Sequence, residues 1–177
     1  MTINKIKRLF LAAPAIIFSS SALAVLLTNG ARLPLTFLVG EIIFGYGANQ
    51  SLKRTLKFLN PTHKDWIRPV DHPAIGCGSF PNFEYDRNSQ SFGMPSGHAQ
   101  ISSFAATFFT IVMLKRMKEG VVTPTQALST ITILWLMQIM VGGMRISVKC
   151  HTIKQVVVGT VIGAIFAWFY TTSMLKN

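Results

Sequence analysis

The chain has 177 residues, of which 50% are apolar and 13% are charged, and its mean hydropathy is +0.42. That charged fraction is roughly half of the value in ordinary soluble domains, which favours a membrane protein. The formal net charge is +11, but the basic residues lie between long apolar runs rather than along one polar surface. This arrangement argues against a nucleic-acid partner. The length suits one domain, so residues 1–177 are treated as a single membrane domain.

Five apolar stretches predict an all-α bundle of about five membrane-spanning helices. Residues 9–27 are long enough to cross a bilayer, and we favour a retained helix over a cleaved signal peptide. The other stretches are residues 33–48, 99–114, 127–144 and 156–175. The stretches at 33–48 and 99–114 are also short enough to be buried helices of a soluble protein. The start of the stretch at 127–144 is marked by Pro124.

Two features inside these stretches bear on packing. Glu41 is costly in a bilayer and is expected to face the protein interior or a wet cavity. Either Glu41 pairs with a basic site residue, or its helix starts nearer the membrane surface than the apolar stretch at 33–48 indicates. Gly159 and Gly163, with Ala167 one step further, have the spacing of closely packed helices. We expect that packing inside one bundle, without a dimer interface.

A long polar segment, residues 50–97, separates the second and third predicted spans. Its first part, residues 50–59, predicts a short amphipathic interfacial helix with Leu52, Leu56 and Leu59 on one face. The remainder is punctuated by proline and glycine, which is typical of irregular loop. A loop of this length in a small protein is usually functional or disordered.

The two cysteines, Cys77 and Cys150, lie in loops that flank the motifs described below. There is no C-x-x-C pair, so neither a zinc site nor a thioredoxin-like site is indicated. A disulfide between them is geometrically possible, but we expect two free thiols. The redox compartment stays open.

The sharpest local signal is Met94-Pro95-Ser96-Gly97-His98, directly before the third predicted span. Pro95 and Gly97 allow a tight turn at a helix start, where amide N–H groups and the helix dipole favour an anion. Ser96 adds a hydroxyl donor, and His98 can give or take a proton near neutral pH. A histidine before a helix is more often structural, so this turn alone does not establish a site.

The second signal is the pair Arg145 and His151, six positions apart between the fourth and fifth predicted spans. A guanidinium group suits phosphate oxygens, although an interfacial loop with snorkelling cations has the same composition. Because the chain crosses the membrane twice between this loop and His98, both histidines are expected on the same face. A nucleophile, an acid and several cations on one face meet the requirements of phosphoryl transfer.

Together these motifs resemble the type 2 phosphatidic acid phosphatase superfamily of membrane lipid phosphatases. Its pattern is K-x6-R-P, then P-S-G-H, then S-R-x5-H with an acidic residue four positions later. Residues 95–98 match the second motif in full, and Arg145 and His151 match the third. The resemblance covers roughly residues 49–167, with motif loops at about 49–98 and 143–155. It implies a phosphatase acting on a lipid-linked phosphate, with membrane lipids as surroundings.

Two positions of the third motif depart from the pattern. Met144 replaces the serine before Arg145, and Gln155 replaces the acidic residue that normally holds the nucleophilic imidazole. Gln155 can still fix the imidazole tautomer but brings no charge. A glutamine here is similar to the dolichyl diphosphate phosphatase branch, which favours a polyprenyl diphosphate substrate over phosphatidate.

The first motif is the least clean. Lys53 has the family's spacing to a residue before proline, but that residue is Asn60 instead of arginine, and an Arg-Pro pair follows only at Arg68. We expect Lys53 and Arg68 to take the places of the family's lysine and arginine. Lys57 and Lys64 are the alternatives.

The resemblance implies that His151 attacks phosphorus to form a phosphohistidine, that His98 protonates the leaving oxygen, and that Gln155 completes the catalytic group. The implied phosphate ligands are Lys53, Arg68, Ser96, Gly97 and Arg145. No metal or cofactor is expected, because the loops hold few carboxylates and these lack ligand spacing.

Two competing classes remain. The first is an inactive membrane protein of the same fold that binds phospholipid headgroups. The second is a transporter or channel, which would carry charges deep in its spans, where only Glu41 fits. A vanadate-dependent peroxidase shares the motifs but is large and soluble. The membrane side of the site stays undecided, since the positive-inside rule favours the cytosol and the family usually faces the lumen or cell exterior. The oligomeric state is not indicated.

Overall fold

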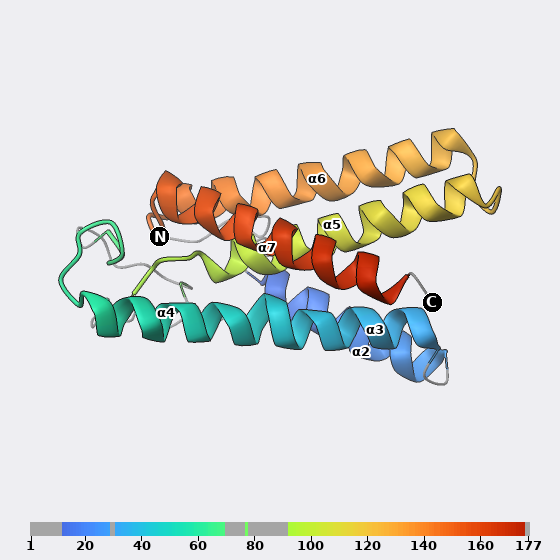
Figure 1. The fold of residues 1–177 in the computed structure, drawn as a ribbon. Helices are drawn as coiled ribbons and strands as arrows, with labels where there is room; N and C mark the ends of the chain where they lie inside the picture. The colour runs from blue at the N-terminus through green and yellow to red at the C-terminus, as the bar shows by residue number, and fades with distance from the viewer. Residues whose placement is uncertain (1–11, 29–30, 70–76, 78–91, 176–177) are drawn as a thin grey trace.

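The computed structural model describes residues 12–28, 31–69, 77 and 92–175. Within these ranges the regular structure is helical, apart from one isolated antiparallel bridge, which confirms the predicted all-α class. Figure 1 shows the helices packed lengthwise as a bundle. They are α2 (Ala13–Leu27), α3 (Arg32–Gly40), η1 (Glu41–Gly47), α4 (Ala48–Leu59), α5 (Gly97–Lys118), α6 (Pro124–Ser147) and α7 (Ile153–Met174).

Three of the described helices, α5, α6 and α7, are long and apolar enough to cross a membrane. They have 22, 24 and 22 residues, which gives lengths of about 33–36 Å and matches the hydrocarbon core. Helix α6 begins with Pro124 in its first turn, behind a capping box made by Thr123 and Gln126, as the proline predicts. Helix α2 is a shorter apolar helix, and the beginning of the first predicted span lies outside the described residues.

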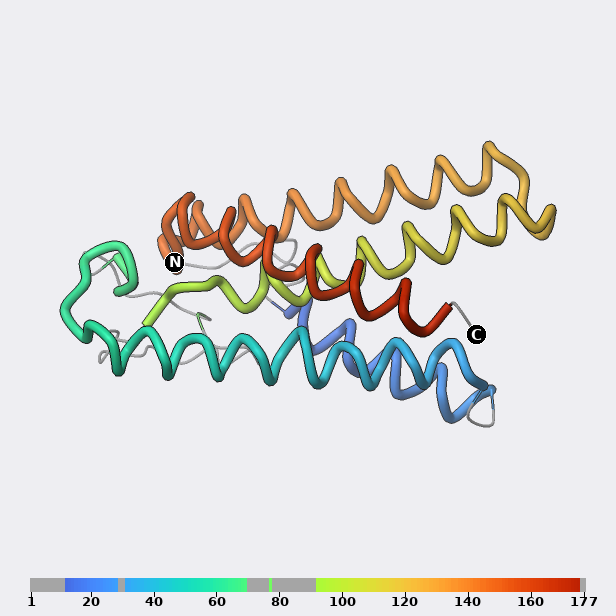
Figure 2. Tube along the Cα trace, viewed as in Figure 1, coloured from blue at the N-terminus to red at the C-terminus, as the bar shows by residue number. Residues whose placement is uncertain are grey.

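Helices α3, η1 and α4 follow one another without a break and form one long rod (Figure 2). The stretch predicted as an amphipathic helix is therefore helical, but it continues the second span instead of lying apart from it. The last turn of α4 carries two exposed apolar side chains, Phe58 at 88% and Leu59 at 66%. An exposed apolar turn just beyond a membrane span suits the headgroup region.

Glu41 begins the π-helical stretch η1 and is fully buried, which confirms its predicted interior position. Among the described residues its carboxylate oxygens have no hydrogen-bond partner. The interpretation that Glu41 pairs with a basic site residue is therefore not supported. Nor does the helix start shallower, because it begins at Arg32, nine positions earlier.

Helix α5 is the centre of the bundle. Most of its apolar window is buried inside the protein, whereas α6 and α7 leave most of theirs on the outer surface. The buried cluster around α5 includes Phe37, Phe104, Phe108 and Ala167. Exposed leucine, isoleucine and valine side chains on α6 and α7 fit contact with lipid, where an apolar surface carries no cost.

Gly159 and Gly163 bring α7 against the beginning of α5. A Cβ atom at Gly159 would lie 3.1 Å from the Ser96 amide nitrogen, and one at Gly163 would lie 3.0 Å from the carbonyl carbon of Gln100. Only glycine allows the two backbones to approach so closely. This confirms that the small-residue pattern packs inside the bundle, and it fixes the start of α7 beside the turn that precedes α5.

Candidate active site

The predicted motif loops meet at one end of the bundle. Figure 1 shows the beginnings of α5 and α7 and the end of α6 at this same end. The amide of Ser96, which is the N-cap of α5, donates to the carbonyl of Gln155 in the first turn of α7 over 3.0 Å. Arg145 lies in the last turn of α6. The two loops therefore open on the same face, as the sequence predicts.

The turn at Pro95 is held from behind by two buried amides. The Asn49 Nδ2 donates to the Pro95 carbonyl over 3.3 Å and to the Gln100 Oε1 over 2.9 Å. The Gln100 Nε2 in turn donates to the carbonyl of Phe44 over 2.8 Å. Sequence reasoning missed this support because Asn49 and Gln100 lie 51 positions apart, and no local pattern joins them.

The turn before α5 provides hydrogen-bond donors that can bind an anion. Ser96 is fully buried, and among the described residues its hydroxyl has no hydrogen-bond partner and does not cap α5. The first amides of a helix have no intrahelical acceptor, so those that begin at Gly97 point outward from the helix end. His98 lies in this first turn and is 2% exposed. Hydroxyl and amide donors thus lie together next to a buried imidazole.

His151 directly precedes the N-cap of α7, and its Nδ1 lies 3.1 Å from the Oε1 of Gln155. The Gln155 Nε2 donates to the carbonyls of Asp65, over 3.0 Å, and Ile67, over 2.8 Å. Because both N–H groups of the side-chain amide donate to carbonyls, its oxygen must face the imidazole and accept a hydrogen bond from the Nδ1–H. The network therefore assigns the proton of His151 to Nδ1 and leaves a lone pair on Nε2.

The backbone holds Gln155 in this orientation as well. The backbone N–H of Gln155 donates to the Thr152 Oγ1, and the side-chain oxygen of Gln155 accepts from the backbone N–H of Thr152. Both distances are 3.3 Å, and together the two bonds form a capping box. The loop opposite is fastened by an exposed ion pair between Lys154 and Asp65 at 3.1 Å. The side chain of Gln155 is fully buried and has little freedom to rotate.

Cationic groups surround His151. Burial lowers the pKa of His151 well below its ordinary value, and the charges of Arg145, Arg68, Lys53 and His98 lower it further, in that order. Burial also lowers the pKa of Lys53 to about 7, and the charges of Arg68 and Arg145 add to this. These effects require the groups to lie close together. The imidazole is therefore neutral at physiological pH, and a bound anion would relieve the repulsion among the cations.

The structure separates the candidates for the first motif. Lys53 lies on α4, and its charge is one of those that lower the pKa of His151. Asn60 is exposed and accepts hydrogen bonds from the amide and hydroxyl of Thr62, each over 3.2 Å. Asn60 is thus a turn residue. Lys57 and Lys64 are exposed.

Arg68 reaches the site through backbone pairing. Ile67 forms an antiparallel bridge with Phe92, and the Gly93 amide donates to the Trp66 carbonyl over 2.8 Å. This pairing places Arg68, which is partly buried, beside the segment that leads into the turn before α5. The position of Arg68 agrees with its choice as the substitute arginine.

The expectation of two free thiols is wrong, because Cys77 and Cys150 form a disulfide. The Nη2 of the fully buried Arg145 donates to the Cys77 carbonyl over 2.9 Å, and the Arg145 carbonyl accepts from the amides of Cys150 and His151. The bridge therefore ties the long polar segment to both third-motif residues. Because the cysteines lie 73 positions apart and have no characteristic spacing, the sequence could not favour the bond over free thiols.

Comparison with known proteins agrees with this arrangement. The model of the PAP2 superfamily matches residues 34–177. Dolichyldiphosphatase 1 of Dictyostelium discoideum is 33% identical over 131 residues, which is 72% of this chain and 48% of that protein. The chain thus spans about half the length of this curated relative. No solved structure matches. These findings confirm the resemblance to the type 2 phosphatidic acid phosphatases, including the dolichyl branch.

The substitution Gln155→Glu is predicted to destabilise the protein, although it restores the family's acidic residue. The carboxylate would face the carbonyls of Asp65 and Ile67 without a donor, at a cost of roughly 1–3 kcal/mol. Protonation removes the conflict, so the pKa of the new carboxyl is raised in the folded state. The loss is therefore complete above that raised pKa, shrinks as the pH falls from it toward the ordinary glutamate pKa of about 4.3, and is absent below that value.

Thermal unfolding in detergent at several pH values measures this effect. The matched control is Gln126→Glu, which changes the same position of the capping box at the start of α6, where the side chain is exposed. That variant should be as stable as the wild type or slightly more stable. Equal stability of Gln155→Glu and wild type at all pH values would contradict the assigned amide orientation.

Proposed function

Because this chain belongs to the PAP2 superfamily, we propose that it is an integral membrane phosphatase that acts on a lipid-linked phosphate through a phosphohistidine at His151. One observation supports this proposal most strongly. The side-chain oxygen of Gln155 accepts a hydrogen bond from the Nδ1–H of the neutral His151, which leaves the ring's lone pair on Nε2. Cationic side chains surround this imidazole. A neutral nucleophile beside several cations suits attack on an anionic phosphorus centre.

In the first step, the Nε2 lone pair of His151 attacks phosphorus and the bond from phosphorus to the leaving oxygen breaks. His98 donates a proton to that oxygen, so the lipid product leaves protonated. In the second step, water attacks the phosphohistidine, the N–P bond breaks and His98 takes a proton from the water. Inorganic phosphate leaves, and both imidazoles return to their starting states.

The phosphoryl oxygens are bound by donors from three parts of the chain. Lys53 and Arg68 come from the first motif, and Arg145 comes from the end of α6. The Ser96 hydroxyl and the Gly97 amide complete the set. Preorganised donors of this kind stabilise the charge of the transition state, and loss of one typically costs about 2.7–4 kcal/mol.

We favour a polyprenyl diphosphate as substrate, with a phosphatidate-type lipid next. Glutamine at position 155 is the feature of this chain that resembles the dolichyl branch. The curated relative that is 33% identical over 131 residues is a dolichyldiphosphatase by name. A second anionic phosphate is also compatible with a site that holds several cations.

The disulfide supports a site that faces away from the cytosol. Disulfides persist in oxidising compartments and are rare where glutathione and thioredoxin keep thiols reduced. The bond between Cys77 and Cys150 lies directly beside Arg145 and His151. The motif loops therefore belong on the lumenal or extracellular side, and several of the cations in these loops serve as phosphate ligands.

The substitutions His151→Ala and His98→Ala are predicted to remove phosphate release from lipid phosphates while the protein stays folded. Loss of the nucleophile should leave only background activity, and loss of the acid should lower the rate by about 10²–10⁴-fold. The measurement is phosphate release from polyprenyl diphosphate, phosphatidate and phosphatidylglycerophosphate. His63→Ala is the control, because His63 stacks on Trp66 in the loop and should be dispensable. Full activity in both site variants would refute the assignment.

The value of kcat/KM is predicted to fall as the pH rises above about 7, because Lys53 loses its charge there and binds phosphate less well. No acid limb is expected near the ordinary histidine pKa of about 6.5, since the pKa of His151 lies well below it. Lys53→Arg keeps the charge at all these pH values and should move the fall to higher pH, while Lys57→Arg should not. An unchanged alkaline limb in Lys53→Arg would assign that limb to another group.

The membrane side is tested with a membrane-impermeant maleimide on sealed vesicles of known orientation. The wild type is suitable, because it has only the two cysteines. We predict no labelling before reduction, and labelling after reduction only from the side opposite the cytosol. Labelling of unreduced protein would contradict the disulfide, and labelling from the cytosolic side alone would contradict the proposed orientation.

A further inference from the structure

A second cavity lies at the end of the bundle opposite to the proposed active site. It has a volume of about 240 Å³ and is lined by residues from the beginning of α3 and the ends of α5 and α7. Figure 1 shows these helix ends together, away from the beginnings of α5 and α7. His98 and Lys115 lie at opposite ends of the 22-residue helix α5, roughly 25 Å apart. One phosphate group therefore cannot occupy both sites.

The lining of this cavity is amphipathic. Arg32, the first residue of α3, and Lys115, in the last turn of α5, supply two cationic side chains. Leu33, Phe108 and Met174 supply hydrocarbon, and none of the described residues that line the cavity is acidic. The cavity therefore suits an anion that is attached to an apolar group.

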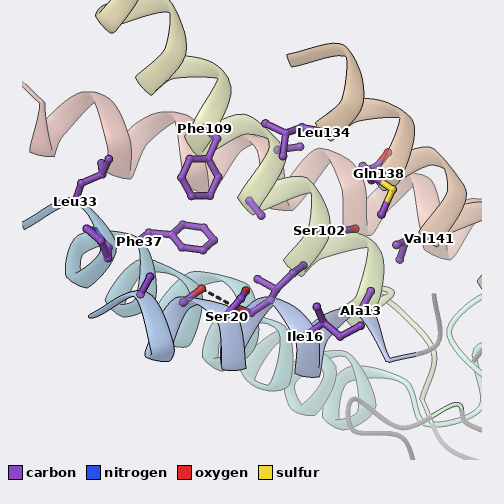
Figure 3. Close-up of a pocket in the computed structure, with 17 residues that line it drawn as sticks. Ala13, Ile16, Ser20, Leu33, Phe37, Ser102, Phe109, Leu134, Gln138 and Val141 are labelled. Atoms are coloured by element: carbon purple, nitrogen blue, oxygen red, sulfur yellow. Dashed lines mark hydrogen bonds between the residues drawn. The ribbon is translucent and has the colours of Figure 1, made fainter. Parts of the chain in front are cut away.

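The neighbouring groove, drawn in Figure 3, has a different character. Its volume is about 540 Å³, and none of its 17 lining side chains is charged. The two spaces share only Leu33, which lies at one end of the groove in Figure 3. Of the two, only the smaller cavity has cationic side chains in its lining.

A buried hydroxyl in the lining of the smaller cavity lacks a partner. Thr171 is fully buried, and among the described residues its Oγ1 has no hydrogen-bond partner. Other threonines of the bundle donate to the carbonyl four positions earlier, as Thr110 does over 2.7 Å and Thr172 over 2.6 Å. A buried polar group without a partner costs stability. An oxygen of a ligand in the cavity would supply the acceptor that Thr171 lacks.

The two cations keep donors for such a ligand. The Lys115 Nζ donates to the Leu175 carbonyl at the end of α7 over 2.9 Å, and its ion pair with Glu119 is long, at 3.9 Å, and half-exposed. An exposed pair of this kind contributes little, and an ammonium group has three N–H donors. Neither of the two ion pairs found in the described part of the chain involves Arg32, whose side chain is exposed.

We propose that this cavity binds the phosphate of an anionic membrane lipid in the leaflet opposite to the active site. The phosphate lies between Arg32 and Lys115 and accepts a hydrogen bond from Thr171, while Leu33 and Met174 contact the beginning of an acyl chain. A free anion would make no use of this apolar wall. With the orientation proposed above, the leaflet is the cytosolic one, whose anionic lipids attract basic side chains.

The size of the cavity limits what it holds. Pockets that enclose a whole small molecule measure roughly 300–1,000 Å³, and this cavity is smaller, at about 240 Å³. The phosphate and the atoms next to it therefore fill the cavity, and the rest of the lipid stays in the bilayer. Because α3, α5 and α7 all contribute to the lining, a bound lipid should stabilise the packing of these three helices.

Arg32→Gln tests the requirement for charge, because the exposed side chain can be changed without disturbing the core. The matched control, Arg116→Gln, removes an exposed cation from the last turn of α5 that does not line the cavity. Native mass spectrometry counts the lipids bound after purification with phosphatidylglycerol or phosphatidylcholine. We expect wild type and Arg116→Gln to retain one more phosphatidylglycerol than Arg32→Gln, and all three to retain phosphatidylcholine equally. Equal retention of phosphatidylglycerol by the three proteins would overturn the proposal.

Thr171→Val tests the hydrogen bond, because it keeps the shape of the side chain and removes the hydroxyl that lacks a partner. The control Thr172→Val removes a hydroxyl that already has a partner in its own helix. In thermal unfolding, saturating phosphatidylglycerol should raise the Tm of wild type and Thr172→Val by about 5 °C or more. Thr171→Val should be at least as stable as wild type without lipid and should gain less from it. Equal gains in Thr171→Val and wild type would overturn the assigned site.

Inorganic phosphate separates a lipid from a free anion as the ligand. The unfolding measurements are repeated with millimolar phosphate in place of the lipid, on wild type and Arg32→Gln. We expect phosphate to stabilise both proteins equally, because it binds at the active site. Stabilisation that Arg32→Gln loses would assign the cavity to free phosphate and overturn the lipid proposal. These measurements do not use phosphatase activity, so a failure of the proposed function leaves them unaffected.

Discussion

The side-chain amide of Gln155 is the interaction on which the rest of the site depends. Its nitrogen donates to the carbonyls of Asp65 and Ile67 in the loop before Arg68, and its oxygen accepts a hydrogen bond from the Nδ1–H of His151. The backbone carbonyl of the same residue accepts from Ser96 at the start of α5. One buried residue therefore sets the position of the arginine loop, the orientation of the imidazole and the distance to the phosphate turn. A carboxylate cannot do all of this, because it has no donor for the loop carbonyls.

The parts of the molecule that follow from local chemistry were predictable. Hydropathy identified α5, α6 and α7, Pro124 marked the start of α6, and the glycine spacing on α7 indicated close packing. The P-S-G-H turn and the pair Arg145 and His151 lie at one end of the bundle as expected. The likeness to a membrane phosphatase family was predictable for the same reason, since its motifs are short and local.

What the sequence could not supply are contacts between distant segments. The Cys77–Cys150 bond spans 73 positions, and the brace from Asn49 to Gln100 spans 51. The partners of the Gln155 nitrogen are backbone carbonyls, which leave no trace in residue identity. For that reason the sequence predicts only that the glutamine orients the imidazole without bringing a charge, whereas the structure also makes it the residue that joins two loops.

The most direct test of this account is to trap the phosphoenzyme and locate the phosphoryl group. Rapid quenching at high pH during turnover of a lipid diphosphate, followed by mass spectrometry and comparison with the two phosphohistidine isomers, identifies both the residue and the ring nitrogen. The account predicts phosphorus on the Nε2 of His151, because the Nδ1 proton is held by Gln155. Phosphorus on Nδ1, on another residue, or no phosphoenzyme in a preparation that releases phosphate would contradict it.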